Sequence, residues 1–481
     1  MCFSMCPAQA TAVTLSSDGR AAGEVTLTAK EEECPRRRGS FLGSKLALKR
    51  TYQGTRVEGN SFTINRAEGS VTAGDLISNY TDSLRRSESD QVSSRTKRFK
   101  GTQRHVCNNE RMHPRSRHLG AYLDYKRLGE KYEYLKPFLT QNRHGGNHLD
   151  LRDQLALYSL SKALLMECYG LEFDLPLAEE KFLVPCVPSR ANYVHHAADL
   201  LVDVELEATL YLELHRPARD VDRVNALVKE TAPLRGEGVR ILDIGVGANC
   251  IYPLLGATEY GWSFVGTDVS ERSLAVAQRN VDSNGLGSRI SLRHQPNSQC
   301  YFEGAVEAGD LFALCMCNPP FHESAAQINV CPVRSLEAQD HELMCEGGEL
   351  QFIKGMIAES RRRCAQFMWF SSLVARAATI RELKKVMRSE LREFRENKKQ
   401  ESLLDKFWMD VVGNRGSGVA SDISAPGENT EGDSCPTVNV SEFRCKELYQ
   451  GKQTRWVMCW TFWTKRQRKV FREFILGARA C

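Results

Sequence analysis

The feature that most constrains the fold is a regular alternation of strand-like and helix-like segments that begins at residue 239. VRILDI (239–244) and WSFVGTD (262–268) are apolar enough to be strands buried on both faces. Residues 270–284 form an amphipathic helical pattern with Ser270 as its cap. Further strands are predicted at 290–294, 311–317 and 366–372, and a further helix at 348–363. Strands that alternate with helices predict an α/β fold, in which helices cover both faces of a parallel sheet.

The sequence on either side of this alternation has a different texture. Residues 1–110 are rich in Ser, Gly, Thr and charge, whereas apolar residues recur with a helical period over 151–169. Residues 379–408 are strongly helical and basic, and strands at 439–449 and 455–463 are predicted to close the sheet. The expected segments are a disordered basic extension (1–110), an N-terminal helical subdomain (111–235), a Rossmann-like core (236–411), a disordered insertion (412–438) and the closing strands of the core (439–481).

Composition narrows the class of protein. With 481 residues, of which 42% are hydrophobic, the chain can fill a large core. No apolar run reaches the roughly 18 to 20 residues that span a bilayer, so no membrane association is expected. The 17 cysteines are scattered and include no CxxC pair, which favours buried thiols in a reducing compartment and no metal site. The nucleus or the cytoplasm is therefore expected, with RTKRFK (95–100) as a candidate nuclear signal and an organellar transit peptide as an alternative.

Positive charge is concentrated in one short segment. The net charge is only +5, yet residues 93–118 hold eight Lys or Arg, among them Arg115 and Arg117, against the single acid Glu110. Such a local excess favours an anionic partner more than the total charge does.

A glycine pair follows the first strand of the alternation. Gly245 and Gly247 let the backbone approach a ligand at the carboxyl edge of the sheet. Asp243 precedes this loop, and Asp268 ends the next strand, where a carboxylate can accept both hydroxyls of a ribose. The structural alternatives are a tight turn for the glycines and a helix cap beside Ser270 for Asp268.

The same loop argues against a phosphate-bearing ligand. It runs GVGANCIYP, so Cys250 stands where the dinucleotide fingerprint GxGxxG has its third glycine. A cofactor without phosphate is therefore favoured. S-adenosylmethionine fits, with its adenosine on Asp268, its methionyl part against the glycine loop and its amino group near Asp243.

The fourth predicted strand runs into CMCNPPFHES (315–324), whose prolines give up backbone donors at the carboxyl edge of the sheet. An exocyclic amine of adenine is a poor nucleophile because its lone pair is delocalised into the ring. The Asn318 side-chain oxygen and the Pro319 carbonyl can accept the two amine hydrogens and so redirect that lone pair. Pro320 keeps the turn rigid, and Phe321 can stack on a base that has been flipped or left unpaired. The structural alternative is a strand stop with Phe321 in the core.

Together these residues resemble the RlmF-type adenine-N6 RNA methyltransferases and their eukaryotic methyltransferase-like relatives. The resemblance covers about 112–376 and resumes over the last strands. It rests on HPRSRHLGAYLDY, VPSRANYVHHAADLL, LDIGVGANCIYPLLGATEYGW, CNPPFHES, CEGGE, WFSSLV and QGKQTRWVMCWTF. It implies a class I methyltransferase sheet, S-adenosylmethionine as cofactor, and methyl transfer to adenine N6 in structured RNA, either ribosomal or small nuclear RNA.

The resemblance also implies roles for single residues, such as Arg190 as the ligand of the cofactor carboxylate. The expected cofactor-binding residues, from the motifs and the resemblance together, are Arg190, Asp243, Gly245, Gly247, Asn249, Asp268 and Asn318. The expected RNA contacts, from the basic segment and the resemblance together, are Arg115, Arg117 and Arg376. Without the resemblance, Arg190 is equally an ion pair at the surface, and Arg376 is an ordinary solvated charge.

Two alternative functions make different predictions. The family includes a fungal branch that methylates a small amine, so a small-molecule N-methyltransferase would turn over without RNA. A noncatalytic RNA-binding regulator that senses the cofactor would tolerate Asn318→Ala. His195 and His196 are expected to be satisfied helix residues rather than ligands, and Arg455 and Trp456 are expected to pack the closing strand.

Overall fold

The computed structural model describes residues 112–120, 123–141, 146–203, 220–323, 338–396, 438–450 and 453–477, and single positions between 206 and 213. All of them belong to one compact unit, residues 65–481. The predicted disorder of 1–110 and 412–438 falls outside the described residues, apart from Val438, and stays a prediction.

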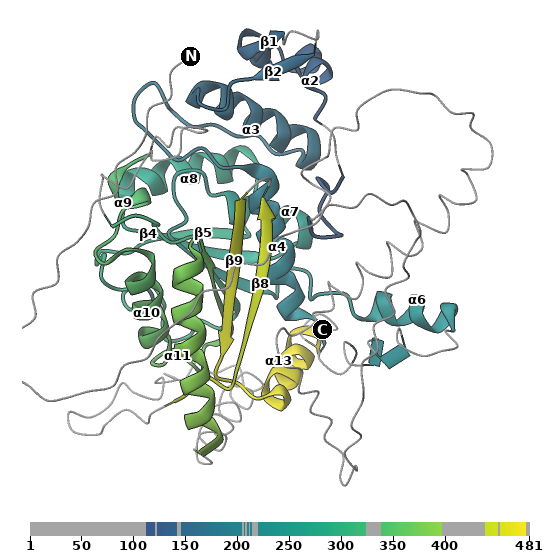
Figure 1. Ribbon diagram of the computed structural model, residues 1–481, viewed down its shortest axis with the longest axis vertical. Helices are drawn as coiled ribbons and strands as arrows, with labels where there is room; N and C mark the ends of the chain where they lie inside the picture. The colour runs from purple at the N-terminus through teal and green to yellow at the C-terminus, as the bar shows by residue number, and fades with distance from the viewer. Residues whose placement is uncertain are drawn as a thin grey trace, which may run out of the picture. The chain divides into compact units, whose positions relative to one another are not determined.

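A mixed sheet forms the centre of this unit (Figure 1). Its strands within the described residues are β3 (Arg240–Ile244), β4 (Ser263–Asp268), β5 (Ile290–His294), β6 (Phe312–Cys317), β7 (Phe367–Val374), β8 (Glu442–Gln450) and β9 (Gln453–Thr461). They lie side by side in the order β5-β4-β3-β6-β7-β9-β8. The first five are parallel, and β9 and β8 close the sheet as antiparallel strands. The chain leaves β3 in one direction and β6 in the other, so a crevice is expected at the carboxyl ends of these two neighbouring strands.

Helices cover the sheet on both faces. In chain order, the helical elements are α2 (Tyr125–Lys131), η2 (Glu133–Phe138), α3 (Gln154–Tyr169), α4 (Val187–Ala198), η3 (Asp199–Leu201), α6 (Val221–Glu230), α7 (Ile251–Tyr260), α8 (Glu271–Ser283), α9 (Asp340–Leu343), α10 (Gly348–Ser360), α11 (Ala377–Glu396) and α13 (Lys465–Gly477). Helices α7 and α8 contact β4, whereas α10 contacts β7. Right-handed crossovers that leave a sheet in opposite directions lie on opposite faces, so α7 and α8 cover one face and α10 the other.

The N-terminal helices share the core of the sheet. Helices α3 and α4 contact each other and α7, and α4 also contacts β8. One hydrophobic cluster runs from Leu128 to Ile475 and includes four fully buried tryptophans. They are Trp262, Trp369, Trp460 and Trp463. The segment predicted as a helical subdomain therefore continues the core, and this packing fixes α4 relative to the sheet.

The predicted alternation is confirmed to within two residues for each strand of the parallel part. Ser270 caps α8 as expected, because its Oγ accepts a hydrogen bond from the Ser273 N–H at 3.1 Å. The prediction that residues 439–481 contain only strands was wrong, because this segment ends in helix α13. Phe471, Phe474 and Ile475 in this helix lie at helical spacing and carried a usable signal. The sequence analysis placed His195 and His196 in a helix without giving its bounds, which are those of α4, and it missed the short hairpin of β1 (Leu139–Gln141) and β2 (Asn147–Leu149).

The structure also bears on the predicted basic helix and on membrane-spanning segments. The basic helix predicted over 379–408 is described as α11 up to Glu396. None of the helices in the described ranges is long and apolar enough to cross a membrane.

Candidate active site

A cavity of about 1000 Å³ lies at the carboxyl edge of the parallel strands. Its walls include the ends of β3, β4 and β6, the start of α4, and segments 298–303 and 341–347. The polar side chains that line it include Arg190, Asn249, Asp268, Asn318, His341 and Glu342. A cavity of this size at the point where the strand order reverses is a typical cofactor site in an open α/β sheet.

The glycine loop turns at the end of β3. Gly245 (φ +70°) and Gly247 (φ +62°) have a left-handed backbone, which favours glycine. The Gly247 N–H donates to Asp268 Oδ2 at 2.8 Å and so ties the loop to the end of β4. A Cβ added at Gly245 would meet no atom within 4 Å. The tight turn considered from the sequence is therefore present, and it leaves space beside Gly245 for a ligand.

Asp268 connects the glycine loop with the start of α8. One carboxylate oxygen accepts the Gly247 N–H, and the other accepts the Ser270 N–H at 2.9 Å. Burial raises the pKa of Asp268, although these backbone hydrogen bonds act to lower it. Asp268 lines the cavity, and each of its carboxylate oxygens can accept a second hydrogen bond. It can therefore also accept hydrogen bonds from the hydroxyls of a ribose.

Asp243 is the one predicted cofactor-binding residue that does not line the cavity. It is fully buried directly before Ile244 and Gly245, which do line it. Neither carboxylate oxygen has a hydrogen-bond partner among the described residues. Burial, followed by the charge of Asp268, raises the pKa of Asp243 well above its ordinary value. A buried acceptor without a donor costs free energy, and the amino group of a cofactor that reached Asp243 would offset this cost.

Arg190 extends from the first turn of α4 to the end of β6. Its Nη1 donates to Tyr252 Oη at 3.1 Å and to Asn318 Oδ1 at 3.2 Å. Within the described ranges it forms no ion pair, so the surface ion pair considered from the sequence is not present. A guanidinium that lines a cavity without a carboxylate partner can bind the carboxylate of a ligand through two hydrogen bonds.

Asn249 lines the same cavity, but its side chain also binds within the protein. Its Nδ2 donates to the Leu183 carbonyl at 3.1 Å, and its Oδ1 accepts the Ile251 N–H at 3.1 Å. These bonds fix the start of α7 after the glycine loop. The second hydrogen on Nδ2 is the group that Asn249 can offer to a ligand.

The NPPF turn begins where β6 ends. Asn318 and Pro320 line the cavity, and Pro319 is buried. Phe321 is half-buried and is not part of the hydrophobic core, so the strand stop with a core phenylalanine is not what the structure has. The Arg455 guanidinium lies over the Phe321 ring, 5.0 Å from its centroid, which is a contact that the sequence analysis missed.

Residues 343–345, which end α9 and begin the CEGGE block (345–349), hold this turn from the side. The His322 N–H donates to the Leu343 carbonyl, and the Cys345 N–H donates to the His322 carbonyl, both at 3.0 Å. The Cys345 thiol also donates to the Pro320 carbonyl at 3.6 Å. Three bonds from one short segment therefore fix the conformation of the turn.

The last residue of the CEGGE block, Glu349, connects this region with the loop after β7. Glu349 is buried, and its carboxylate accepts the backbone N–H groups of Ala375 and Arg376. These bonds fix the backbone of Arg376, which is an exposed residue. Burial lowers the pKa of Arg455, and the positive charges of Arg190 and Arg376 lower it further. Three arginines therefore concentrate positive charge beside the turn, and an RNA contact by Arg376 stays a prediction.

Glu342 is a cavity residue that the sequence analysis did not select. It belongs to α9, and its carboxylate accepts hydrogen bonds from the backbone of Leu183 and Gln339. Burial, together with the charge of Asp268, raises the pKa of Glu342 to about 7, although the two hydrogen bonds act to lower it. Its place directly before the CEGGE block was the only local signal.

Arg115 and Arg117 lie away from this cavity. Arg115 donates to Asp199 Oδ1 at 2.6 Å and to Tyr260 Oη at 2.9 Å. Asp199 follows α4 and Tyr260 ends α7, whereas the cavity lies at the starts of both helices. Helix α4 has 12 residues and so spans about 18 Å. Arg117 is half exposed and pairs with Glu259. RNA contacts by these two arginines stay predictions, and they would fall on a surface away from this cavity.

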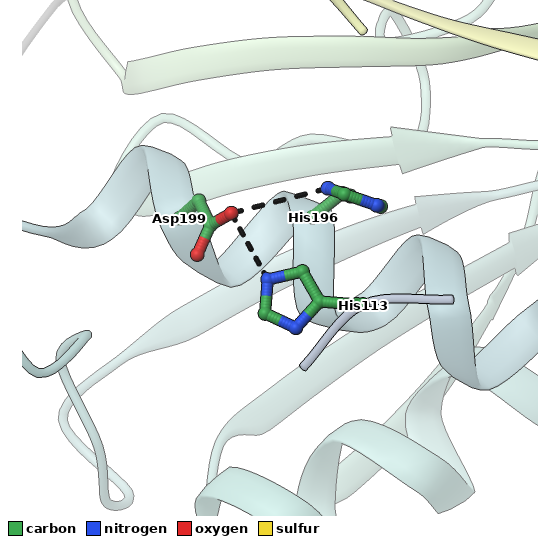
Figure 2. A group of neighbouring side chains, drawn as sticks. All are labelled: His113, His196 and Asp199. Carbon is green, nitrogen blue, oxygen red and sulfur yellow. Dashed lines mark hydrogen bonds and ion pairs between the residues drawn. The ribbon is translucent and has the colours of Figure 1, made fainter. Parts of the chain in front are cut away.

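Two histidines join Asp199 in a cluster with the ligand types of a metal site (Figure 2). Asp199 Oδ2 is 3.1 Å from His113 Nε2 and 3.9 Å from His196 Nδ1. The Arg115 backbone N–H donates to His113 Nδ1 at 3.1 Å, so Nδ1 is an acceptor and Nε2 carries the ring proton that bonds to Asp199. A metal on Nε2 would force the proton onto Nδ1, against another N–H. The hydrogen bonds therefore favour an anchor for the segment before Arg115 over a metal site.

The groups around the cavity suit a ligand with a ribose and a charged amino-acid tail. Asp268 matches the diol, Arg190 matches a carboxylate, and the buried Asp243 matches an amino group, whereas the loop lacks the third glycine of a phosphate site. S-adenosylmethionine has this combination of groups. The fold and site are those of a class I S-adenosylmethionine-dependent methyltransferase.

Comparison with known proteins gives the family within this class. A family model described as RNA methyltransferase matches residues 106–215 and 215–393, and the chain belongs to this family. Ribosomal RNA large subunit methyltransferase F of Aeromonas salmonicida (strain A449) is 40% identical over 289 residues, which cover 57% of this chain and 82% of the relative. The protein of the same name from Bacteroides fragilis (strain YCH46) is 37% identical over 296 residues, which cover 58% of this chain and 90% of the relative.

The chain is also similar in structure to a solved catalytic domain. The human Mettl16 catalytic domain in complex with MAT2A 3'UTR hairpin 6 superimposes with a TM-score of 0.51 at 27% identity, covering 73% of this chain and 98% of that chain. The α/β methyltransferase fold, the use of S-adenosylmethionine and the methylation of RNA, all expected from the sequence, are confirmed.

Proposed function

We propose that the protein methylates N6 of an adenine in structured RNA, with the NPPF turn as the binding site for the amine. The observation that carries this proposal is the position of Asn318. It lines the cofactor cavity, is bonded to Arg190 at 3.2 Å and begins the turn. Residues for the cofactor and for the substrate amine therefore meet at one side chain.

The turn offers the amine two acceptors. Arg190 uses one acceptor site of Asn318 Oδ1, and an amide oxygen has two, so the second is available for an amine hydrogen. The Pro319 carbonyl can accept the other hydrogen, and the bonds from residues 343–345 keep the turn rigid. When bound, S-adenosylmethionine supplies an electrophilic methyl group. The protein contributes mainly the fixed orientation of the amine lone pair.

The surroundings of the turn support a nucleic-acid substrate. Phe321 offers a ring for base stacking, and Arg376 and Arg455 place positive charge next to it. The human Mettl16 catalytic domain was solved with an RNA hairpin. Ribosomal or small nuclear RNA is accordingly the substrate that we propose, in the nucleus or the cytoplasm.

Methylation of total RNA with isotope-labelled S-adenosylmethionine tests this function, followed by mapping of the modified nucleoside. The expected product is N6-methyladenosine in one or a few RNAs. Asn318→Ala is expected to lower turnover by about a hundredfold or more while cofactor binding falls much less. Asn147→Ala, which changes a half-buried asparagine in β2 that does not line the cavity, is the matched control and should keep full activity. Transfer into small amines but into no RNA would contradict the proposal, as would full activity of Asn318→Ala.

A further inference from the structure

Glu342 has one oxygen fixed by the protein and one directed at the glycine loop. Its Oε2 accepts the N–H groups of Leu183 and Gln339, each at 3.1 Å. Its Oε1 lies 3.5 Å from the place that a Cβ on Gly247 would occupy, and no group of the described residues donates to it. The carboxylate is thus held in the cavity wall with an acceptor oxygen next to the loop that receives the cofactor.

The charged groups around Glu342 are mostly acids. The charge of Asp268 on β4 acts on Glu342, and the imidazole of the preceding residue, His341, has its Nε2 3.8 Å from Asp268 Oδ1. Glu180 accepts a hydrogen bond from the Gln339 side chain and pairs with Arg272, so that cation is already paired. Within the described ranges, no Lys or Arg pairs with Glu342.

We propose that Glu342 is a cofactor-positioning residue whose carboxylate faces the sulfonium of S-adenosylmethionine and selects the charged donor over the neutral product. The sulfur joins the ribose to the amino-acid chain, so it belongs between Asp268, which suits the ribose, and Arg190, which suits the carboxylate. Transfer of the methyl group removes the positive charge from sulfur, whereas the ammonium and carboxylate are common to S-adenosylmethionine and S-adenosylhomocysteine. A fixed negative charge near the sulfur therefore distinguishes the two ligands. This inference rests on the proposed function only in requiring that the chain binds both.

The test measures the dissociation constants of both ligands for the full chain by isothermal titration calorimetry at pH 6, 7 and 8, without RNA. With a pKa of about 7, Glu342 passes from about 10% to about 90% ionised over this range. The preference of the wild type for S-adenosylmethionine over S-adenosylhomocysteine is expected to rise about tenfold between pH 6 and pH 8. Glu342→Gln is expected to lower that preference and to remove its pH dependence.

Two further variants make the result specific. Asp340→Asn changes an exposed acid of the same helix, α9, that does not line the cavity, and it should behave as the wild type. Glu342→Asp keeps the charge and should keep the pH dependence, which covers the case that the amide variant folds poorly. If Glu342→Gln weakened both ligands equally, the carboxylate would bind a group that they share, and the proposal would be overturned. Unchanged affinities would overturn it as well, whereas failure of the wild type to bind either ligand would refute the proposed function itself.

Discussion

Replacing Asp243 with asparagine is expected to remove a loss of stability that the wild type undergoes as the pH rises. Asp243 is fully buried without a hydrogen-bond partner in the described residues, and burial raises its pKa above the ordinary 3.8. The folded chain therefore keeps this proton at pH values where the unfolded chain has lost it. The stability that the group contributes below pH 3.8 is lost as the pH rises toward its folded pKa, at about 1.4 kcal/mol of unfolding free energy per pH unit.

Asp243→Asn cannot ionise, so it does not lose stability in this way. For a folded unit of more than 250 residues, 1 kcal/mol corresponds to roughly 1 to 2 °C in Tm. The Tm of the variant minus that of the wild type should thus rise by about 1.5 to 3 °C per pH unit above pH 5, while the folded wild type keeps its proton. Thermal denaturation of both ligand-free proteins between pH 5 and pH 8 measures this difference, in which the other titrating groups largely cancel.

Asp199→Asn is the matched control, because Asp199 is equally buried but bonded to Arg115 at 2.6 Å and to His113 at 3.1 Å. Burial works to raise the pKa of Asp199, but Arg115 and His113 together hold it below its ordinary value. Breaking a buried ion pair costs about 3 to 5 kcal/mol, so this control should lower the Tm markedly near neutral pH. If Asp243→Asn lowered the Tm in the same way, or changed it equally at every pH, the reasoning about an unpaired carboxyl would be refuted.

The same variant tests why an unfavourable carboxyl is kept at this position. Loss of a charged hydrogen bond to the cofactor amino group costs about 1.5 to 3 kcal/mol, which weakens S-adenosylmethionine binding about ten- to a hundredfold. Calorimetry on Asp243→Asn measures this loss. An unchanged affinity would show that the amino group of the cofactor does not reach Asp243.

Two further predictions separate the cofactor side from the RNA side of the site. Arg190→Lys keeps the charge but loses the planar pair of donors, so the affinity for S-adenosylmethionine should fall about tenfold while that for methylthioadenosine, which has no carboxylate, stays the same; equal losses would contradict the assignment. Glu349→Gln removes the charge that holds the Ala375 and Arg376 N–H groups, so KM for RNA should rise severalfold with little change in cofactor affinity, and a parallel loss of cofactor affinity in calorimetry would count against this connection.

Much of the site followed from local sequence pattern. The backbone at Gly245 and Gly247 is left-handed as a tight loop after a strand requires, and Asp268 ends the second strand. Because parallel strands place their carboxyl ends at one edge of the sheet, these motifs were expected at the same edge as Asn318. That β6 lies directly beside β3 is seen only in the structure. Strand period, helix caps and glycine turns are short-range properties, so a single sequence contains them.

Other parts of the site depend on packing between distant segments. Arg190 reaches the cavity from α4 and Glu342 from α9, whereas Arg455 on β9 reaches the Phe321 ring of the NPPF turn. No local periodicity in the sequence predicts which strand end each of these elements approaches. Arg190 was expected only through the family resemblance, Arg455 was expected to pack the closing strand, and Glu342 was missed.

The basic segment shows the limit most clearly. Its composition correctly indicates an excess of positive charge, yet Arg115 is bound by Asp199, 84 residues away, and by Tyr260, 145 residues away. A run of charges in the sequence shows which side chains are present. Their partners depend on which distant residues folding brings within hydrogen-bond distance. The sequence by itself determined the succession of strands and helices along the chain, the glycine loop and the NPPF turn. Only the tertiary structure decided which arginines and acids face the cavity, because those positions depend on long-range packing of helices and closing strands against the sheet.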